Sequence, residues 1–311
     1  MNRCAIAIHG GAGTISRMSL DPDREAAYRV ALERAARIGH DVLARGGASV
    51  EAVCAAVTDL EDDALFNAGR GAVFNADGEI EMDAAVMDGS RCRAGAVTEV
   101  KRIRNPVLAA RAVMEKTPYV MLGRDGAEAL ALAQGLPMVT ADYFFTPNRW
   151  QALQREKARR AAGAVTPVSD EDRHGTVGAV ALDQAGNLAA ATSSGGHTHK
   201  MAGRIGDTPI IGAGTYAENA TCAVSATGDG EYFICLAVAH EIASRMRYLN
   251  ESLADTASHV VMKTLADAGG TGGLVAIDRL GNVTMPFNTE GMYRASIGVD
   301  GRLTVGIHRS T

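Results

Sequence analysis

The chain has 311 residues, of which 47% are hydrophobic and 22% charged, a composition typical of a globular enzyme. Its net charge of -5 argues against nucleic acids and anionic membranes as partners. The five cysteines are odd in number and form no C-x-x-C pair, which indicates a reducing compartment. We find neither a signal peptide nor an apolar run long enough to span a bilayer, and we expect a cytoplasmic protein.

The first half of the chain is predicted to form paired helices followed by antiparallel strands. A short buried strand over Cys4 to His9 is expected to end in a tight turn at Gly10-Gly11. The signals that follow predict a helix from Pro22 to Gly46, a helix from Val50 to Leu60, hairpins at Asp77-Gly78 and Asp88-Gly89, helices over 106–116, 125–134 and 147–162, and a strand over 119–122.

The second half repeats this order after a polar segment over 163–175. Its signals predict strands over 176–183, 188–194 and 222–226, a glycine-rich loop over 195–207, helices over 231–248 and 253–266, strands over 273–278 and 283–287, and a hairpin at Asp300-Gly301. Neither half buries its sheet alone. The pattern therefore predicts one α+β domain over 1–311, built as a four-layer αββα sandwich.

A hydroxyl residue, Thr176, stands where the polar segment meets the first of these strands, directly after Gly175. A hydroxyl beside its own preceding carbonyl can attack it, and glycine permits the strained backbone that this attack needs. The freed α-amine of Thr176 has a reference pKa near 7.7–8.0 and can serve as base for its own hydroxyl. The alternative interpretation is an ordinary β-branched residue at the start of a strand.

Several stretches resemble the plant-type asparaginases, also called isoaspartyl peptidases, which are N-terminal-nucleophile hydrolases with a threonine nucleophile. They are His174 to Asp183, Ile8 to Gly13, Phe66 to Gly69, Met87 to Gly89, Thr192 to Gly196, Gly203 to Asp207, Gly212 to Ala217, Ala226 to Glu231 and Pro286 to Met292. They cover nearly the whole chain in the family's order. The resemblance implies the αββα fold and autocleavage between Gly175 and Thr176, giving an α subunit over 1–175 and a β subunit over 176–311.

Arg204 and Asp207 lie three residues apart on a glycine-flanked loop. The guanidinium can bind an α-carboxylate in bidentate fashion, and the carboxylate can hold an α-ammonium group. The alternative is a salt bridge within the loop. The resemblance implies that this pair binds the amino-acid head of the substrate.

Thr227 and Gly228 precede a predicted helix, where a hydroxyl and a backbone N–H can form an oxyanion hole aided by the helix dipole. The alternative for Thr227 is plain helix capping. The resemblance implies the oxyanion role for both residues and a backbone contact from Gly230 to the ligand. It also implies that Asn67 orients the region near the nucleophile, whereas the residue type alone suits a left-handed turn.

One position departs from the family, which commonly has threonine where this chain has Ser194. Serine keeps the hydroxyl and loses the methyl group. We expect the hydrogen bond to Thr176 to survive and the rate of maturation, not the reaction type, to change. The neighbouring Thr192 and Ser193 are candidates for the same supporting role.

The histidines and the family resemblance point to two different kinds of ion. His197 and His199 would share a face of a strand, but no third metal ligand is evident, and exposed loop histidines are the favoured interpretation. The resemblance implies instead a structural sodium ion held by backbone carbonyls of Leu60, Glu61 and Phe66, and no cofactor for catalysis.

The resulting hypothesis is an amidohydrolase that cleaves L-asparagine to L-aspartate and ammonia and hydrolyses β-aspartyl dipeptides. Two alternatives remain: a threonine hydrolase similar to glycosylasparaginases, and an amino-acid-binding homologue that never matures. The sequence does not rank asparagine against isoaspartyl peptides. The expected assembly, by resemblance only, is a dimer of αβ heterodimers.

Overall fold

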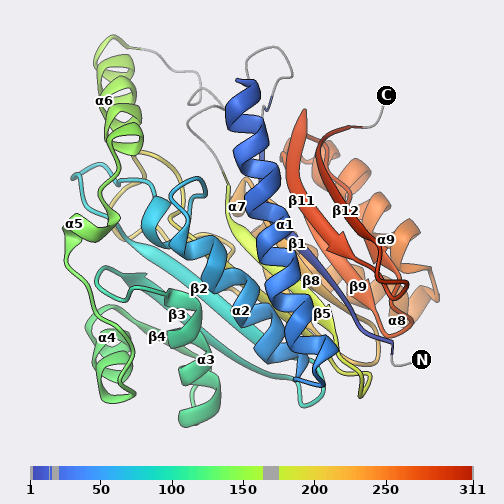
Figure 1. Cartoon of the computed structure of the whole chain (residues 1–311). Helices are drawn as coiled ribbons and strands as arrows, with labels where there is room; N and C mark the ends of the chain where they lie inside the picture. The colour runs from blue at the N-terminus through green and yellow to red at the C-terminus, as the bar shows by residue number, and fades with distance from the viewer. Residues whose placement is uncertain (1–2, 14, 16–20, 164–174, 310–311) are drawn as a thin grey trace.

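The structure is a computed structural model of the chain, drawn in Figure 1, and it describes residues 3–13, 15, 21–163 and 175–309. Most of the segment expected over 163–175 therefore lies outside the described residues, as does His174 of the maturation-site motif. Among the described residues, no helix is long and apolar enough to cross a membrane.

Two sheets form the centre of the molecule. The eight-stranded sheet has the order β12-β11-β1-β5-β6-β2-β3-β4, and the four-stranded sheet has the order β10-β9-β8-β7. The larger sheet consists of β1 (Ala5–Gly13), β2 (Met82–Asp88), β3 (Arg93–Val100), β4 (Met121–Gly123), β5 (Val177–Leu182), β6 (Leu188–Ser194), β11 (Gly291–Ile297) and β12 (Leu303–His308). The smaller consists of β7 (Thr215–Ala217), β8 (Cys222–Gly228), β9 (Gly272–Asp278) and β10 (Val283–Thr284).

Helices cover the outer face of each sheet, which completes four layers and confirms the predicted αββα sandwich (Figure 1). The larger sheet packs against α1 (Pro22–Ala44), α2 (Ser49–Asp62), α3 (Pro106–Lys116) and α4 (Arg124–Ala133). The smaller packs against α8 (Val238–Leu249), α9 (Leu253–His259) and its π-helical continuation η3 (Val260–Leu265). The remaining elements are α6 (Pro147–Ala161) and the short η1 (Gly69–Gly71), α5 (Ala141–Phe144) and α7 (Gly230–Cys235).

The layer between the sheets changes character along its length. Strand alternation sends Val180 and Leu182 of β5 into this layer, where they pack on apolar residues of both sheets. On the same face, toward the other end of the strands, the side chains are His9, Thr192 and Ser225, all fully buried. The polar end of this layer lies directly beneath the start of β5.

Three local predictions were wrong. The first strand does not end in a turn at Gly10-Gly11 but continues to Gly13 through a bulge, because Gly11 adopts a φ of 110° that glycine tolerates. No strands flank the turn at Asp77-Gly78, which closes on hydrogen bonds to Asn75. The helix expected over 231–248 is split into α7 and α8, because Ala237 takes a left-handed conformation with a φ of 48°.

A close contact between β3 and α3 gives a test of this packing. A Cβ added to Gly95 would lie 2.1 Å from the carbonyl oxygen of Ala110, so Gly95→Ala should destabilise the fold by about 1–3 kcal/mol. Gly126→Ala, in open space on α4, is the matched control and should be neutral or stabilising by up to about 1 kcal/mol. Thermal unfolding of both variants measures the difference, and equal melting temperatures would contradict the packing described.

Candidate active site

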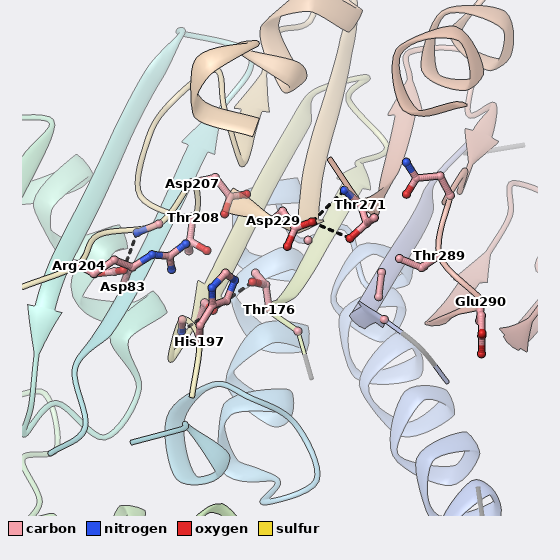
Figure 2. Close-up of a pocket in the computed structure, with 18 residues that line it drawn as sticks. Asp83, Thr176, His197, Arg204, Asp207, Thr208, Asp229, Thr271, Thr289 and Glu290 are labelled. Atoms are coloured by element: carbon pink, nitrogen blue, oxygen red, sulfur yellow. Dashed lines mark hydrogen bonds between the residues drawn. The ribbon is translucent and has the colours of Figure 1, made fainter. Parts of the chain in front are cut away.

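One pocket collects most of the residues expected to act together (Figure 2). The expected residues that line it are Gly175, Thr176, Ser194, Arg204, Asp207 and Gly228. They come from the start of β5, the end of β6, the loop that follows β6 and the end of β8. The structure thus brings both proposed functions, nucleophile and amino-acid binding, into one cavity.

The candidate nucleophile is held by its hydroxyl. Thr176 is 7% exposed, and its Oγ1 donates a hydrogen bond of 3.0 Å to Oγ of Ser194. The Ser194 hydroxyl also accepts from the backbone N–H of Gly196 at 2.9 Å. The hydrogen bond expected for serine at this position is therefore present, and the loop after β6 fixes the serine oxygen.

Glycine is required at position 175 because there is no space for a side chain, and not because the backbone is strained. A Cβ on Gly175 would lie 2.5 Å from Oγ1 of Thr227 and 2.8 Å from Cα of Gly11, and the φ of Gly175 is outside the left-handed region. Oγ1 of Thr227 in turn accepts from the backbone N–H of Ala12 at 3.3 Å. The bond expected to break therefore lies in a close contact between β1, β5 and β8, a cause that differs from the strain inferred from the sequence.

The two members of the proposed zwitterion clamp do not pair with each other. Nε and Nη2 of Arg204 donate to the carboxylate of Glu231, both at 2.9 Å, which places Nη1 close to two glycines that line the pocket, Gly196 and Gly206. This arrangement excludes a salt bridge between Arg204 and Asp207 as the reason for the pair. Glu231 instead orients the guanidinium toward the cavity.

Asp207 is buried with part of its carboxylate unsatisfied. It is 4% exposed, and its Oδ2 has no hydrogen-bond partner. Burial raises the pKa of Asp207 to about 7, while the positive charge of Arg204 opposes this rise. An unpartnered buried carboxylate that lines a pocket is suited to bind a cationic ligand group such as an α-ammonium.

The end of β8 brings Gly228 to the pocket. Gly228, with a φ of 148°, pairs with Gly272 of β9, and both must be glycine because a Cβ on either would meet the opposite backbone within 2.6 Å. The N-cap of α7 is Asp229 and not Thr227, so plain helix capping by Thr227 is excluded. The helix has only six residues, so its dipole contributes less than the long helix predicted from the sequence would.

Three expected residues support the pocket from behind its lining. Asn67 accepts from the N–H of Val73 and donates to the carbonyl of Gly196 at 2.7 Å, and its φ is not left-handed, so it positions the loop after β6. Thr227 is fully buried beneath Gly175. A Cβ on Gly230 would lie 2.7 Å from Oδ1 of Asp207, so its small size lets that carboxylate approach.

The hydroxyl neighbours of Ser194 point in different directions because they lie on a strand. The Ser193 hydroxyl donates to Glu61 Oε1 at 2.6 Å in the helix-covered layer. Thr192 points into the layer between the sheets and bonds Oγ of Ser225 at 2.8 Å. Neither contacts Thr176 directly, so the support expected from them is not given to the nucleophile hydroxyl itself.

The two histidines after β6 lie in a turn and not on a strand, and neither is fully exposed as expected. His197 lines the pocket, and His199 has a left-handed φ of 63°. Among the described residues, no three histidine, cysteine, aspartate or glutamate side chains gather closely enough to hold a metal ion.

The residues proposed to hold sodium lie at the end of α2 and in the segment that follows it. Carbonyls of Glu61 and Phe66 come so close to Gly69 and Gly71 that a Cβ there would lie 2.3 and 2.0 Å from the oxygens. Burial raises the pKa of the Glu61 carboxyl to about 8, so the side chain adds little charge near neutral pH. A set of neutral oxygen donors fits a hard monovalent cation.

Sequence reasoning missed Asp83, Glu231 and His197. Asp83 is 1% exposed, lines the pocket and accepts from the N–H of Glu99 at 3.0 Å. An aspartate directly before the apolar run Ala84 to Met87 was the available signal for Asp83. Glu231 lies within one of the motifs given above, but nothing in the sequence placed it against Arg204. His197 was noted only as a disfavoured metal ligand and not as a residue of this pocket.

Comparisons with known proteins agree with this geometry. An asparaginase family profile matches residues 2–307. The chain belongs to the asparaginase family. It is 49% identical to the isoaspartyl peptidase of Salmonella typhimurium over 99% of this chain and 100% of that protein, and 49% identical to the isoaspartyl peptidase of Escherichia coli over 99% and 97%. It is 39% identical to the human isoaspartyl peptidase/L-asparaginase over 99% and 96%. The family resemblance and the expectation of an enzyme are confirmed.

The raised pKa of Asp207 predicts how amino-acid binding depends on pH. Only the ionised carboxylate attracts an α-ammonium group, so affinity for L-aspartate should weaken as pH falls through about 7, by up to about tenfold per unit. Calorimetric titration at several pH values measures this dependence. Asp207→Asn should bind weakly at every pH, and an unchanged pH profile in that variant would assign the titration to another group.

Proposed function

We propose that the protein hydrolyses the side-chain amide of L-asparagine and the β-peptide bond of isoaspartyl dipeptides after cutting its own chain before Thr176. The single observation that carries the proposal is the Thr176 hydroxyl, bonded to Ser194, in one pocket with Arg204 and Asp207. Relatives named isoaspartyl peptidase or isoaspartyl peptidase/L-asparaginase, at 39–49% identity over nearly their full length, support this substrate class.

Maturation requires an attack by Thr176 on the residue before it. Oγ1 bonds to the carbonyl carbon of Gly175, the C–N bond breaks, and the hydroxyl proton passes to the departing nitrogen. Water then hydrolyses the ester and releases subunits 1–175 and 176–311, with Thr176 at the new N-terminus. Packing of Gly175 against Gly11 and Thr227 supports the step, because it fixes the carbonyl group beside its attacker.

Hydrolysis then uses the same hydroxyl. Arg204 binds the α-carboxylate of asparagine and Asp207 its α-ammonium, which brings the side-chain amide to Thr176. The freed α-amine takes the hydroxyl proton as Oγ1 attacks, and it returns the proton to the departing ammonia. The Thr227 hydroxyl and the Gly228 N–H stabilise the oxyanion, and water cleaves the β-aspartyl ester.

Two further properties belong to the proposal. Carbonyls of Leu60, Glu61 and Phe66 would hold a structural sodium ion, which supports the loop and takes no part in the reaction. We also expect a dimer of αβ heterodimers, by resemblance to the family.

Assays of both substrates test the proposed function. Ammonia release from L-asparagine and aspartate release from a β-aspartyl dipeptide should be measurable for the wild-type protein and absent for Thr176→Ala, which lacks the attacking oxygen. Equal circular dichroism of the two proteins provides the folding control. Hydrolysis of a glycosylated asparagine alone would favour the glycosylasparaginase-like alternative, and binding without turnover would favour the non-maturing homologue.

Removing one oxyanion donor should slow turnover strongly. Thr227→Val keeps the shape of the side chain and removes its hydroxyl, so kcat should fall on the order of 100- to 1000-fold with a smaller change in KM. The comparison requires protein that has matured. A variant that matures and keeps wild-type kcat would remove Thr227 from the oxyanion site.

A further inference from the structure

A chain of buried polar side chains runs beneath the pocket without lining it. It consists of His9 on β1, Ser225 on β8, Thr192 on β6 and Thr215 on β7, all fully buried, so that it draws on four strands and both sheets. We propose that this path of four side chains is a positioning device: it connects the backbone under Thr176 to the loop that carries Asp207. The inference rests on the proposed function, because it assigns these residues to the same reaction.

The contacts form one continuous path. His9 Nε2 lies 2.9 Å from Oγ of Ser225, which lies 2.8 Å from Oγ1 of Thr192. Thr192 Oγ1 lies 2.6 Å from Oγ1 of Thr215, and the Thr215 hydroxyl donates to the carbonyl of Thr208 at 3.0 Å. Five polar groups are thus joined in a layer that is otherwise apolar.

The first end of the path reaches the nucleophile. His9 on β1 pairs with Gly178 on β5. Gly178 is two residues after Thr176, so the two positions lie on the same face of the sheet. Burial lowers the pKa of His9 to about 3, and the adjacent backbone of Thr176 opposes this only in part, so the ring is neutral. A Cβ on Gly178 would lie 1.9 Å from Oγ of Ser225 and 2.5 Å from Nε2 of His9, so the pair occupies the space that a side chain there would need.

The other end reaches the substrate loop. Thr208 directly follows Asp207 and also lines the pocket. The carbonyl of Asp207 accepts from the N–H groups of Ile210 and Gly214, so this part of the loop is a compact turn. Holding the Thr208 carbonyl on Thr215 therefore fixes where the Asp207 carboxylate stands relative to β5.

Each member of the path has only one proton to donate. A neutral histidine has one N–H, and each hydroxyl has one proton. The Thr215 hydroxyl can donate to Thr192 Oγ1 or to the carbonyl of Thr208, and the hydroxyls of Ser225 and Thr192 also lie 3.3 and 3.4 Å from the carbonyls of Ala191 and Gly214. Loss of one hydroxyl then leaves a buried partner unsatisfied and affects both ends, so that the members should act as a unit.

A purely structural role would give a different result from a positioning role. Buried hydroxyls that only stabilise the core would lower the melting temperature without changing kcat or KM. Members of one positioning path should change catalysis, and breaking the path twice should cost no more than breaking it once.

The test compares kcat and KM for L-asparagine among matured proteins whose two fragments are verified by mass. Thr192→Val and Thr215→Val should each lower kcat/KM about tenfold, and the double variant should lose about the same tenfold and not a hundredfold. Thr215→Val, near the loop end, should act mainly on KM. Thr192→Ser restores the hydroxyl and should return kcat/KM to near the wild-type value.

Thr256→Val is the matched control, since it removes a fully buried hydroxyl from the helix layer outside the smaller sheet. It should lower the melting temperature and leave kcat and KM unchanged. Additive losses in the double variant, or unchanged kcat and KM in both single variants, would overturn the proposal. Failure of Thr192→Val alone to mature, with Thr192→Ser and Thr256→Val maturing, would support it. An inactive wild-type protein would refute the proposed function instead.

Discussion

The structure depends on a close approach between two glycines and a buried threonine hydroxyl, which leaves no room for a side chain on either glycine. Gly11, Gly175 and Thr227 meet at the polar end of the layer between the sheets, with a Cβ on Gly175 excluded by the Thr227 hydroxyl. This contact sets the position of the Gly175 carbonyl and, one residue later, of the Thr176 hydroxyl on Ser194. A candidate nucleophile directly before a buried strand is held rigidly by the sheet and still faces a cavity.

The same pocket has a charged region around Arg204 and Asp207 and a region of hydroxyl groups around Thr176. Arg204 is oriented by Glu231, and Asp207 is left buried with an unpartnered oxygen, an arrangement that is costly unless a ligand supplies the missing charge. The Thr176 hydroxyl, by contrast, bonds to another hydroxyl, that of Ser194. In the proposed reaction, charged groups would bind the amino-acid head and neutral groups would act on the amide.

The sequence was sufficient for the layers and for most of the site, because apolar alternation, glycine turns and ordered motifs are local signals. The sequence was insufficient where a residue adopts a conformation unusual for its type, or where partners lie far apart along the chain. Ala237 breaks a helix in a left-handed conformation that alanine rarely adopts, so no pattern marks the break. Glu231 meets Arg204 across 27 residues, and His9 meets Ser225 across 216, distances at which only the folded structure identifies partners.

The central claim is that Thr176 becomes a new N-terminus, and the intact mass of the purified wild-type protein tests it most directly. The account predicts two fragments, one of which begins at Thr176 and ends at Thr311. A single stable full-length species, or a cut at any other bond, would contradict the account, because the α-amine that serves as base would then not exist.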